Sequence, residues 1–328
     1  MSSYSKQAAD AVPSNWDAYH IPSQKDKVAI VTGGNSGVGY ETALELVRKG
    51  AQVVLGCRNE GRGAEAVKKI QAEVADAPEA GSVAFIKLDM ADLSTVKSFA
   101  DEFRKTHNRL DLLINNAGVS GVQYGVTVDG FESHIGINHL GPFALTAQLF
   151  DLLKQSPHAR IVNVSSMKHR SAKLDVNKLM LNEDNYNGDT AYDNSKLGNI
   201  LFTFELTRRC EANGISNILA VASHPGASKT NILVEPTTNN KFWDKMKWKF
   251  LSILPVYQPA SMGALPSLYA ATAPGVKSGE FYGPGGFMSL GGHPALEDPS
   301  EDSKSATTAL KLWEVSEQLT KVSFPITK

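Results

Sequence analysis

The stretch KVAIVTGGNSGVGYETALEL, residues 27–46, joins a β-type apolar run to a helical pattern through a glycine-rich loop. Gly33, Gly37 and Gly39 stand where the backbone must turn tightly and let a pyrophosphate approach the amides at the start of a helix. Turns use glycine freely, so the triplet alone is weak evidence. Its place after a first strand and before a helix favours a dinucleotide-binding loop.

The alternation of short β-rich runs with longer helical runs continues along the chain and predicts six strands. Runs such as KVAIV and ARIVNV are apolar throughout, which is typical of central strands buried on both faces. Strands separated by helices predict a parallel sheet with right-handed crossovers. The expected strands are residues 27–32, 51–57, 82–88, 110–116, 159–166 and 215–223.

The predicted fold class is therefore α/β, a single-domain Rossmann-type doubly wound parallel sheet with helices on both faces. We expect this dinucleotide-binding catalytic domain to occupy residues 25–328. Residues 1–24 are expected to be a polar lead-in, in which Trp16 and Tyr19 lie against the surface of the domain.

The composition is that of an ordinary globular protein, with 42% hydrophobic and 20% charged residues among 328. The 33 Lys and Arg residues nearly balance the 34 Asp and Glu residues, which argues against nucleic acid as the ligand. Cys57 and Cys210 could pair, but a core of this size needs no disulfide, as in a reducing compartment. The sequence has no signal-peptide pattern and no apolar run of about 18 residues, so we expect a cytoplasmic protein without a transmembrane segment.

The end of the second expected strand indicates which dinucleotide is bound. A carboxylate there would accept hydrogen bonds from the ribose hydroxyls of NAD and would repel a 2'-phosphate. Cys57 occupies that position and Arg58 follows it, and a guanidinium can hold a phosphate with two directed hydrogen bonds. We therefore expect NADP(H) in preference to NAD(H), with Asn35 and Ser36 as further donors. The alternative is that Arg58 is only a surface charge after a strand.

The ordered motifs of this chain resemble those of the short-chain dehydrogenases/reductases. They follow the family's order over roughly residues 24–325 and are TGGNSGVG, LDMADL, NNAG, GINHLGPF, IVNVSS, YDNSK and HPGASKT. Within the family, GINHLGPFALT, AYDNSKLGNILFTFEL and SHPG are most similar to the retinol-dehydrogenase-like branch, which includes the WW-domain oxidoreductases and the protochlorophyllide reductases. The chain is similar to soluble members of that branch that lack a WW module.

The resemblance implies further contacts with the cofactor. Val38 belongs to the glycine loop, and Asp89 and Met90 are implied to face the adenine. Without the family, Asp89 would be an ordinary strand-end acid and NNAG an ordinary turn. The NNAG run is implied to lie along the cofactor and the HPGASKT run to border the nicotinamide. Their implied contact residues are Asn116, Ala117, Gly118, Pro225, Gly226, Ala227 and Thr230.

Tyr192 and Lys196 lie four positions apart in a segment with a helical pattern, so they share one helix face. Hydride transfer at a carbonyl carbon needs a proton moved at the oxygen. A tyrosine, with an unperturbed pKa of about 10, serves this purpose when nearby positive charge favours its phenolate. The resemblance implies that Tyr192 is the general acid/base and Lys196 its electrostatic partner, and that both touch the cofactor.

Two more catalytic residues are implied by the resemblance. Ser166, the second serine of VNVSS, matches the family's substrate-orienting hydroxyl, in preference to Ser165. Asn138 matches a helix-embedded amide that holds a water between Lys196 and solvent. Without the family, Asn138 would be interpreted as a surface amide, because asparagine is at best neutral within a helix.

The separation of 26 positions between Ser166 and Tyr192 is longer than in many family members, and the retinol-dehydrogenase-like branch shares it. We expect the intervening residues to loop over the active site and to shape the choice of substrate. His169 and His224 have no partner cluster at ligand spacing, so no metal site is predicted.

Residues 231–257 are expected to form a lid over the substrate. Trp243, Met246, Trp248 and Phe250 would make it apolar and suited to a hydrophobic aldehyde, ketone or alcohol. The alternative is an ordinary amphipathic helix packed on the core. The four lysines among residues 241–249 also allow weak contact with an anionic membrane surface.

Taken together, these features predict an NADP(H)-dependent oxidoreductase that interconverts a hydrophobic aldehyde or ketone and its alcohol. Two alternatives are a catalytically silent NADP(H)-sensing regulatory protein and a protochlorophyllide-reductase-like activity. A sensor usually lacks part of the Ser, Tyr and Lys group, and all of it is present here. The expected partner is a small hydrophobic carbonyl or alcohol, and the resemblance also implies a homo-oligomer, because family members are often dimers or tetramers.

Overall fold

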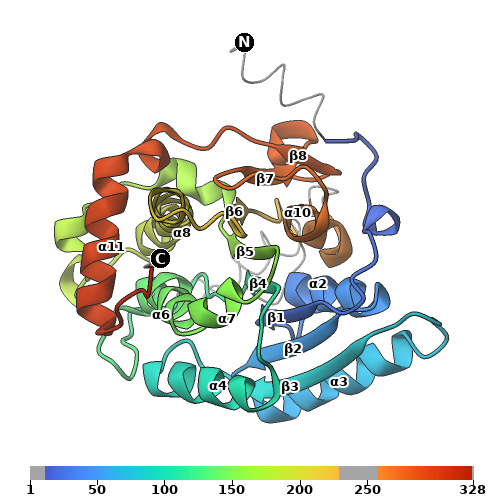
Figure 1. The fold of residues 1–328 in the computed structure, drawn as a ribbon. Helices are drawn as coiled ribbons and strands as arrows, with labels where there is room; N and C mark the ends of the chain where they lie inside the picture. The colour runs from blue at the N-terminus through green and yellow to red at the C-terminus, as the bar shows by residue number, and fades with distance from the viewer. Residues whose placement is uncertain (1–11, 229–256, 327–328) are drawn as a thin grey trace, which may run out of the picture.

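An eight-stranded sheet forms the centre of the computed structural model, which describes residues 12–228 and 257–326 (Figure 1). The strand order is β3-β2-β1-β4-β5-β6-β7-β8, and every neighbouring pair is parallel except β7 with β8. The bounds are β1 Val28–Thr32, β2 Gln52–Cys57, β3 Ser82–Lys87, β4 Leu112–Asn115, β5 Ala159–Val164, β6 Ile218–Ser223, β7 Phe281–Pro284 and β8 Pro294–Leu296.

Helices cover both faces of this sheet (Figure 1). One face carries α2 Gly37–Arg48, α3 Glu60–Glu73 and α10 Ala260–Thr272. The other face carries α4 Leu93–Thr106, α6 Gly141–Gln148, α7 Phe150–Lys154, α8 Gly188–Ala212 and α11 Ala306–Thr320. The single-domain doubly wound α/β fold predicted from the sequence is confirmed.

The apolar run of β1 supplies a separate core on each face, because successive side chains of a strand point to opposite sides. Val28 and Ile30 pack in the core under α4, whereas Ala29 and Val31 pack in the core under α2 and α10. All four side chains are buried. This explains why the strand is apolar at every position, as expected for a central parallel strand.

The carboxyl ends of β1 and β4 meet at the point where the winding of the sheet reverses. β1 pairs with β2 on one side and with β4 on the other, and the crossovers lead away from it in both directions. In open parallel sheets this switch point forms a crevice where ligands bind. The fold therefore sets a ligand site at the ends of β1 and β4.

The prediction of six strands needs a correction, because all six are present but the sheet has two further strands after them. β7 and β8 extend the edge beyond β6, and β8 runs antiparallel to β7. Gly283, Pro284 and Pro294 lie within these short strands. Glycine and proline are poor strand residues away from edges, which explains why the sequence pattern does not reveal them.

The lead-in has one of its two aromatic residues anchored. Trp16 is buried and its ring meets that of Tyr269 edge-on, with centroids 5.0 Å apart. Tyr19 is 90% exposed, so the expectation that it would lie against the domain is wrong. The neighbouring His20 pairs with Asp17, the residue that caps the short helix η1, Ala18–His20. The Tyr19 ring takes no part in this cap.

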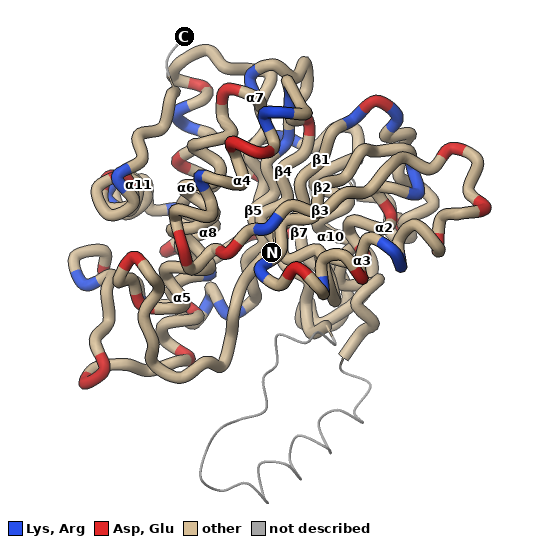
Figure 2. The backbone as a smooth tube through the Cα atoms, turned by 90° about the horizontal axis from the view of Figure 1, so that it is seen from below, with Lys and Arg blue, Asp and Glu red and all other residues tan. Residues whose placement is uncertain are grey.

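Cys57 and Cys210 are both free and buried, and they lie in the cores on opposite faces of the sheet. Lys and Arg residues are interspersed with Asp and Glu along the described chain (Figure 2), in agreement with the nearly balanced charge of the sequence. Among the described residues, no helix is long and apolar enough to cross a membrane.

Candidate active site

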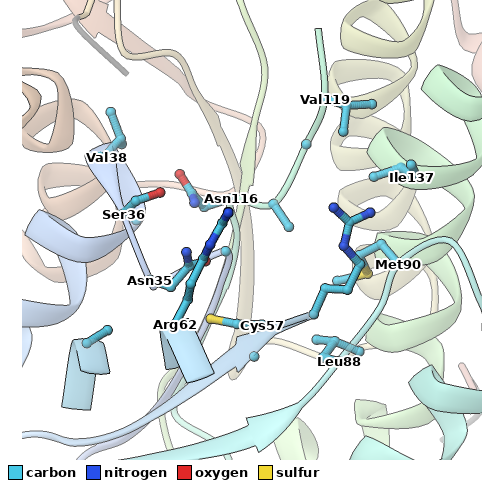
Figure 3. Close-up of a pocket in the computed structure, with 18 of the residues that line it drawn as sticks. Asn35, Ser36, Val38, Cys57, Arg62, Leu88, Met90, Asn116, Val119 and Ile137 are labelled. Carbon is cyan, nitrogen blue, oxygen red and sulfur yellow. The ribbon is translucent and has the colours of Figure 1, made fainter. Parts of the chain in front are cut away.

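A cavity of about 750 Å³ opens at the switch point between β1 and β4 (Figure 3). Twelve residues expected at the cofactor from the sequence line it, and they come from the glycine loop, the ends of β2 and β3, and the NNAG run. They are Gly33, Asn35, Ser36, Gly37, Val38, Gly39, Arg58, Asp89, Met90, Asn116, Ala117 and Gly118.

The backbone around the glycine loop is packed too closely for side chains at two of its glycines. Gly33 has a φ of +67°, a left-handed conformation that glycine adopts without strain. A Cβ atom on Gly39 would lie 2.4 Å from Nδ2 of Asn116 and 2.5 Å from the carbonyl oxygen of Gly33. The loop backbone therefore lies close against the NNAG run at the start of α2, where an anionic group is favoured.

Thr32 joins the glycine loop to the NNAG run. Its hydroxyl accepts hydrogen bonds from the backbone amides of Asn116 and Ala117, at 3.0 Å and 2.9 Å. The side-chain amide of Asn116 donates in turn to the carbonyl oxygen of Thr32 at 2.9 Å. These bonds hold the ends of β1 and β4 together beside the cavity-lining residues Asn116 and Ala117.

One side of the cavity carries more basic groups than the sequence analysis identified. Besides Arg58, the side chains of Arg62 and Lys69 line it, and Lys69 is paired with Glu65 at 2.7 Å. Figure 3 shows Arg62 directed into the cavity. Asn59 caps α3 by accepting a hydrogen bond from the Arg62 amide at 2.9 Å, which fixes Arg62 in the first turn.

These features agree with a dinucleotide as the ligand. The cavity volume is within the range of about 300 to 1,000 Å³ of ligand and cofactor sites. The glycine loop offers amides for a pyrophosphate, and Arg58 and Arg62 offer two guanidinium groups for a further phosphate. No sequence signal distinguished Arg62 from the other charged residues on the exposed face of α3.

The Ser, Tyr and Lys side chains predicted to be catalytic meet beside this cavity. Ser166 follows β5, while Tyr192 and Lys196 lie one turn apart on α8. The Ser166 side chain lies close enough to the Tyr192 hydroxyl to lower the pKa of that hydroxyl. The Lys196 ammonium lies 5.7 Å from the centre of the Tyr192 ring and donates to the carbonyl oxygen of Val164 at 3.1 Å.

Burial acts on both titratable groups of this cluster. It raises the pKa of the Tyr192 hydroxyl, against the opposing effect of the nearby Ser166 side chain and with a smaller contribution from the Asp193 carboxylate. It lowers the pKa of Lys196 to about 8. At neutral pH, Tyr192 is therefore protonated and Lys196 is mostly charged, which suits Tyr192 to giving a proton to a substrate oxygen.

Asn138 occupies a π-helical turn, Gly136–Leu140, and is fully buried rather than a surface amide. Its Oδ1 accepts from the amide of Val119 at 2.7 Å, and its Nδ2 donates to Ser195 Oγ at 2.9 Å. A Cβ on Gly118 would lie 3.0 Å from Oδ1 of Asn138 and 3.3 Å from Nζ of Lys196. Asn138 and Lys196 thus approach the same point of the NNAG run, and π-turns of this kind are frequent at functional sites.

The other residues expected at the nicotinamide are only partly described. Pro225, Gly226 and Ala227 follow β6 at the same edge of the sheet, but they are not among the residues lining the cavity. Thr230 and all of the expected lid, residues 231–257, except Tyr257 lie outside the described residues.

The insert between Ser166 and α8 holds three short 3-10 turns, η3 Met167–Ser171, η4 Val176–Lys178 and η5 Glu183–Asn185.

His169 and His224 are both fully buried beside the ring of Phe281. His169 contacts the carbonyl oxygen of Ser166 and the amide of Ser300, and His224 is paired with Glu297. Within residues 12–228 and 257–326, no group of three or more His, Cys, Asp or Glu side chains is placed to hold a metal ion.

Comparison with known proteins assigns the class of protein. The short chain dehydrogenase family matches residues 27–241, which is more than half of the chain. The protein therefore belongs to the short chain dehydrogenase family.

Several relatives cover nearly the whole chain. Retinol dehydrogenase 12 of Mus musculus is 37% identical over 295 residues, covering 89% of this chain and 86% of its own. Retinol dehydrogenase 11 of Homo sapiens is 38% identical, covering 88% and 84%. The WW domain-containing oxidoreductase of Gallus gallus is 37% identical, covering 89% and 68%. The resemblance to the retinol-dehydrogenase-like branch is confirmed.

Solved structures share the fold. The crystal structure of an uncharacterized protein from Mycobacterium Paratuberculosis has a TM-score of 0.76 and 38% identity, covering 95% of this chain and 99% of that chain. The NADP complex of RhlG from Pseudomonas aeruginosa has a TM-score of 0.61 at 23% identity, covering 79% and 94%. The second likeness supports the fold alone.

We expect Gly39→Ala to weaken NADPH binding by at least about tenfold, because the added methyl group must displace Asn116 or the Gly33 backbone. Fluorescence titration of the variant with NADPH measures this. Gly61→Ala is the matched control, since its Cβ would meet only Asn59 Oδ1 at 3.5 Å. Wild-type affinity in Gly39→Ala would contradict the proposed position of the cofactor.

Proposed function

We propose that the protein is an NADP(H)-dependent reductase of hydrophobic aldehydes or ketones that uses Tyr192 as its general acid. The observation that carries this proposal is the convergence of Tyr192, Ser166 and the buried Lys196 ammonium, which lies 5.7 Å from the centre of the Tyr192 ring, beside a dinucleotide-sized cavity. A catalytically silent sensor of NADP(H) has no need of this group of side chains.

The cofactor would be held by the glycine loop, Asp89, the NNAG run and the two arginines Arg58 and Arg62. When bound, NADPH supplies the hydride that reduces the carbonyl carbon. The preference for NADP(H) over NAD(H) rests on the two guanidinium groups and on Cys57, whose thiol stands where an NAD-binding carboxylate would be expected.

The residues of this chain would handle the carbonyl oxygen. The Ser166 hydroxyl hydrogen-bonds that oxygen and fixes its position next to the Tyr192 hydroxyl. Tyr192 donates its proton to the oxygen as the carbon is reduced, so that an alcohol forms and no free alkoxide develops. Lys196 stabilises the phenolate that remains, because its positive charge lies in a site of low dielectric constant.

The proposed substrate class follows from the relatives and from the sequence of the expected lid. Mammalian relatives at 37% to 38% identity carry the name retinol dehydrogenase, and retinol is a hydrophobic alcohol. The tryptophans and other apolar residues in the sequence of segment 231–257, which lies outside the described residues except for Tyr257, are in keeping with an apolar substrate. We therefore propose retinoid-like and other apolar aldehydes as the first compounds to assay. We also propose the cytoplasm as the compartment in which the protein works.

Replacing Tyr192 by Phe is expected to abolish carbonyl reduction, because the proton donor is lost while the ring is kept. NADPH oxidation is followed by absorbance with a panel of apolar aldehydes and ketones, and NADPH affinity is measured separately. NADPH binding should stay near the wild-type value. Tyr19→Phe, at a 90% exposed position, is the control. Appreciable turnover by Tyr192→Phe would sink the assignment of the acid.

Removal of Arg58 or Arg62 is expected to weaken NADPH binding by about tenfold or more and to leave NADH binding nearly unchanged, since hydrogen bonds to charged groups contribute about 1.5 to 3 kcal/mol. Affinities of Arg58→Ala and Arg62→Ala for both dinucleotides give the comparison. Lys97→Ala, whose exposed side chain pairs with Asp101 on α4, controls for the loss of a positive charge. A wild-type preference for NADH would contradict the NADP(H) assignment.

The reduction rate is expected to fall as the pH rises through about 8. Burial lowers the pKa of Lys196 to about 8, so its ammonium is charged below this pH and neutral above it. Tyr192 keeps its proton over the same range because its pKa is raised. Steady-state kinetics of carbonyl reduction between pH 6 and 10 would test this. The variant Lys196→Arg should keep its reduction rate to higher pH than the wild type. A wild-type rate that does not change with pH would speak against the role of Lys196.

A further inference from the structure

Glu297 carries a largely buried carboxylate and belongs to the C-terminal part of the chain, beyond the residues 27–241 that match the family. Its side chain is only 10% exposed. It follows β8 and has partners on two other segments. Oε1 lies 2.8 Å from Nε2 of His224, and Oε2 lies 3.3 Å from a terminal nitrogen of Arg170. Both partners follow strands whose ends form the active-site edge.

The contact with His224 fixes how that imidazole is protonated. Nδ1 of His224 accepts a hydrogen bond from the backbone amide of Gly226 at 3.1 Å, so Nδ1 carries no proton. The ring proton is therefore on Nε2, where a carboxylate, which only accepts, is the matching partner. Glu297 thus selects the tautomer of His224 that holds the turn at Gly226, a residue with a φ of +63°.

The contact with Arg170 acts on the loop that begins at the catalytic serine. Arg170 lies in η3, which starts next to Ser166, and it donates to the carbonyl oxygen of Asp298 at 2.8 Å as well as to Glu297. In the same stretch, the amide of Ser300 donates to Nε2 of His169 at 3.2 Å, and Nδ1 of His169 meets the Ser166 carbonyl oxygen at 2.6 Å. Residues 297–300 therefore hold two residues of η3, Arg170 and His169, and His169 in turn contacts the backbone of Ser166.

The two braced segments are neighbours in the sheet. β5 and β6 pair in parallel with Val164 opposite Ser223, and the amide of Ser165 donates to the carbonyl oxygen of Ser223 at 2.6 Å. The segment leading to Ser166 and the turn at Gly226 thus leave the sheet side by side. Glu297 has one oxygen on a partner from each of them.

Gly283 of β7 lies against the contact between His224 and Glu297. A Cβ there would lie 2.0 Å from Nε2 of His224 and 2.1 Å from Oε1 of Glu297. Its φ is not in the left-handed region, so the backbone alone does not require glycine at this position. The space for the His224–Glu297 contact depends on glycine at position 283.

We propose that Glu297 is a positioning residue for catalysis, which joins the strand ends carrying Ser166 and Gly226 so that the Ser166 hydroxyl stays in line with Tyr192. The inference rests on the proposed reductase function, and it assigns a role in that reaction to the C-terminal segment. Glu297 itself touches neither substrate nor cofactor.

Glu297→Ala is expected to lower kcat for carbonyl reduction by about 10- to 100-fold, the effect of misplacing a reacting group by a fraction of an ångström. NADPH affinity should change little, because Glu297 is not among the residues that line the described cavity. Glu301→Ala, on the adjacent turn with an 88% exposed carboxylate paired with Lys304, is the matched control and should keep the wild-type kcat.

The double variant Glu297→Ala with His224→Ala separates a shared role from two independent ones. Because both residues act through one contact, the double variant should be no slower than the slower single variant. Gly283→Ala should lower kcat in the same way, because it pushes the pair apart with both residues present. A kcat within about twofold of the wild type for Glu297→Ala, or losses that multiply in the double variant, would overturn the inference.

A measurement without substrate separates this inference from the proposed function. Nitrogen-15 NMR of the histidines should show the His224 proton on Nε2 in the wild type, and a shift towards Nδ1 protonation in Glu297→Gln, whose amide can donate to Nε2. A wild-type proton on Nδ1 would overturn the inference whatever the activity. If the wild type shows the expected tautomer but reduces no carbonyl, the proposed function and the positioning role of Glu297 are overturned. The contact between Glu297 and His224 then remains as a structural feature only.

Discussion

The hydrogen bonds between Thr32 and the Asn116–Ala117 backbone are the constraint on which the rest of the site depends. They join the ends of β1 and β4 where the winding of the sheet reverses, and no helix can cross that gap to fill it. The glycine loop can lie against this joint only because Gly39 has no side chain. The cavity for a dinucleotide is thus a consequence of parallel topology together with the absence of a few Cβ atoms.

The same edge of the sheet brings together the Tyr192 hydroxyl, whose ionised form is negative, and the Lys196 amine, whose protonated form is positive. β5 ends at Val164 and leads to Ser166, and α8 returns over that end with Tyr192 and Lys196 on one face. Burial disfavours the charged form of both groups, so the tyrosine keeps its proton and the lysine becomes easier to neutralise. The pair is consistent with a proton donor whose charged product needs the ammonium beside it, and Asn138 and Ser195 brace the same turn of α8.

Much of this arrangement was predictable from the sequence because it depends on local pattern. The six parallel strands follow from apolar runs, and the glycine loop and Arg58 follow from their places at strand ends, whereas Asp89, Met90 and the NNAG run were implied by the family resemblance. What escaped prediction depends on distant contacts. Glu297 meets His224 across 73 positions, Arg62 looks like any charged residue on an exposed helix, and β7 and β8 are strands because they continue an existing edge, despite Gly283 and Pro284.

The most direct test of the account follows the hydride itself. NADPH carrying deuterium at the transferable position of C4 is incubated with the wild-type protein and an apolar aldehyde such as a retinoid aldehyde, and the alcohol is analysed by mass spectrometry. The account predicts an alcohol with one deuterium on the former carbonyl carbon, formed by the wild type and absent with Tyr192→Phe. NADPH binding without any labelled alcohol, across the whole panel of apolar aldehydes and ketones, would contradict it.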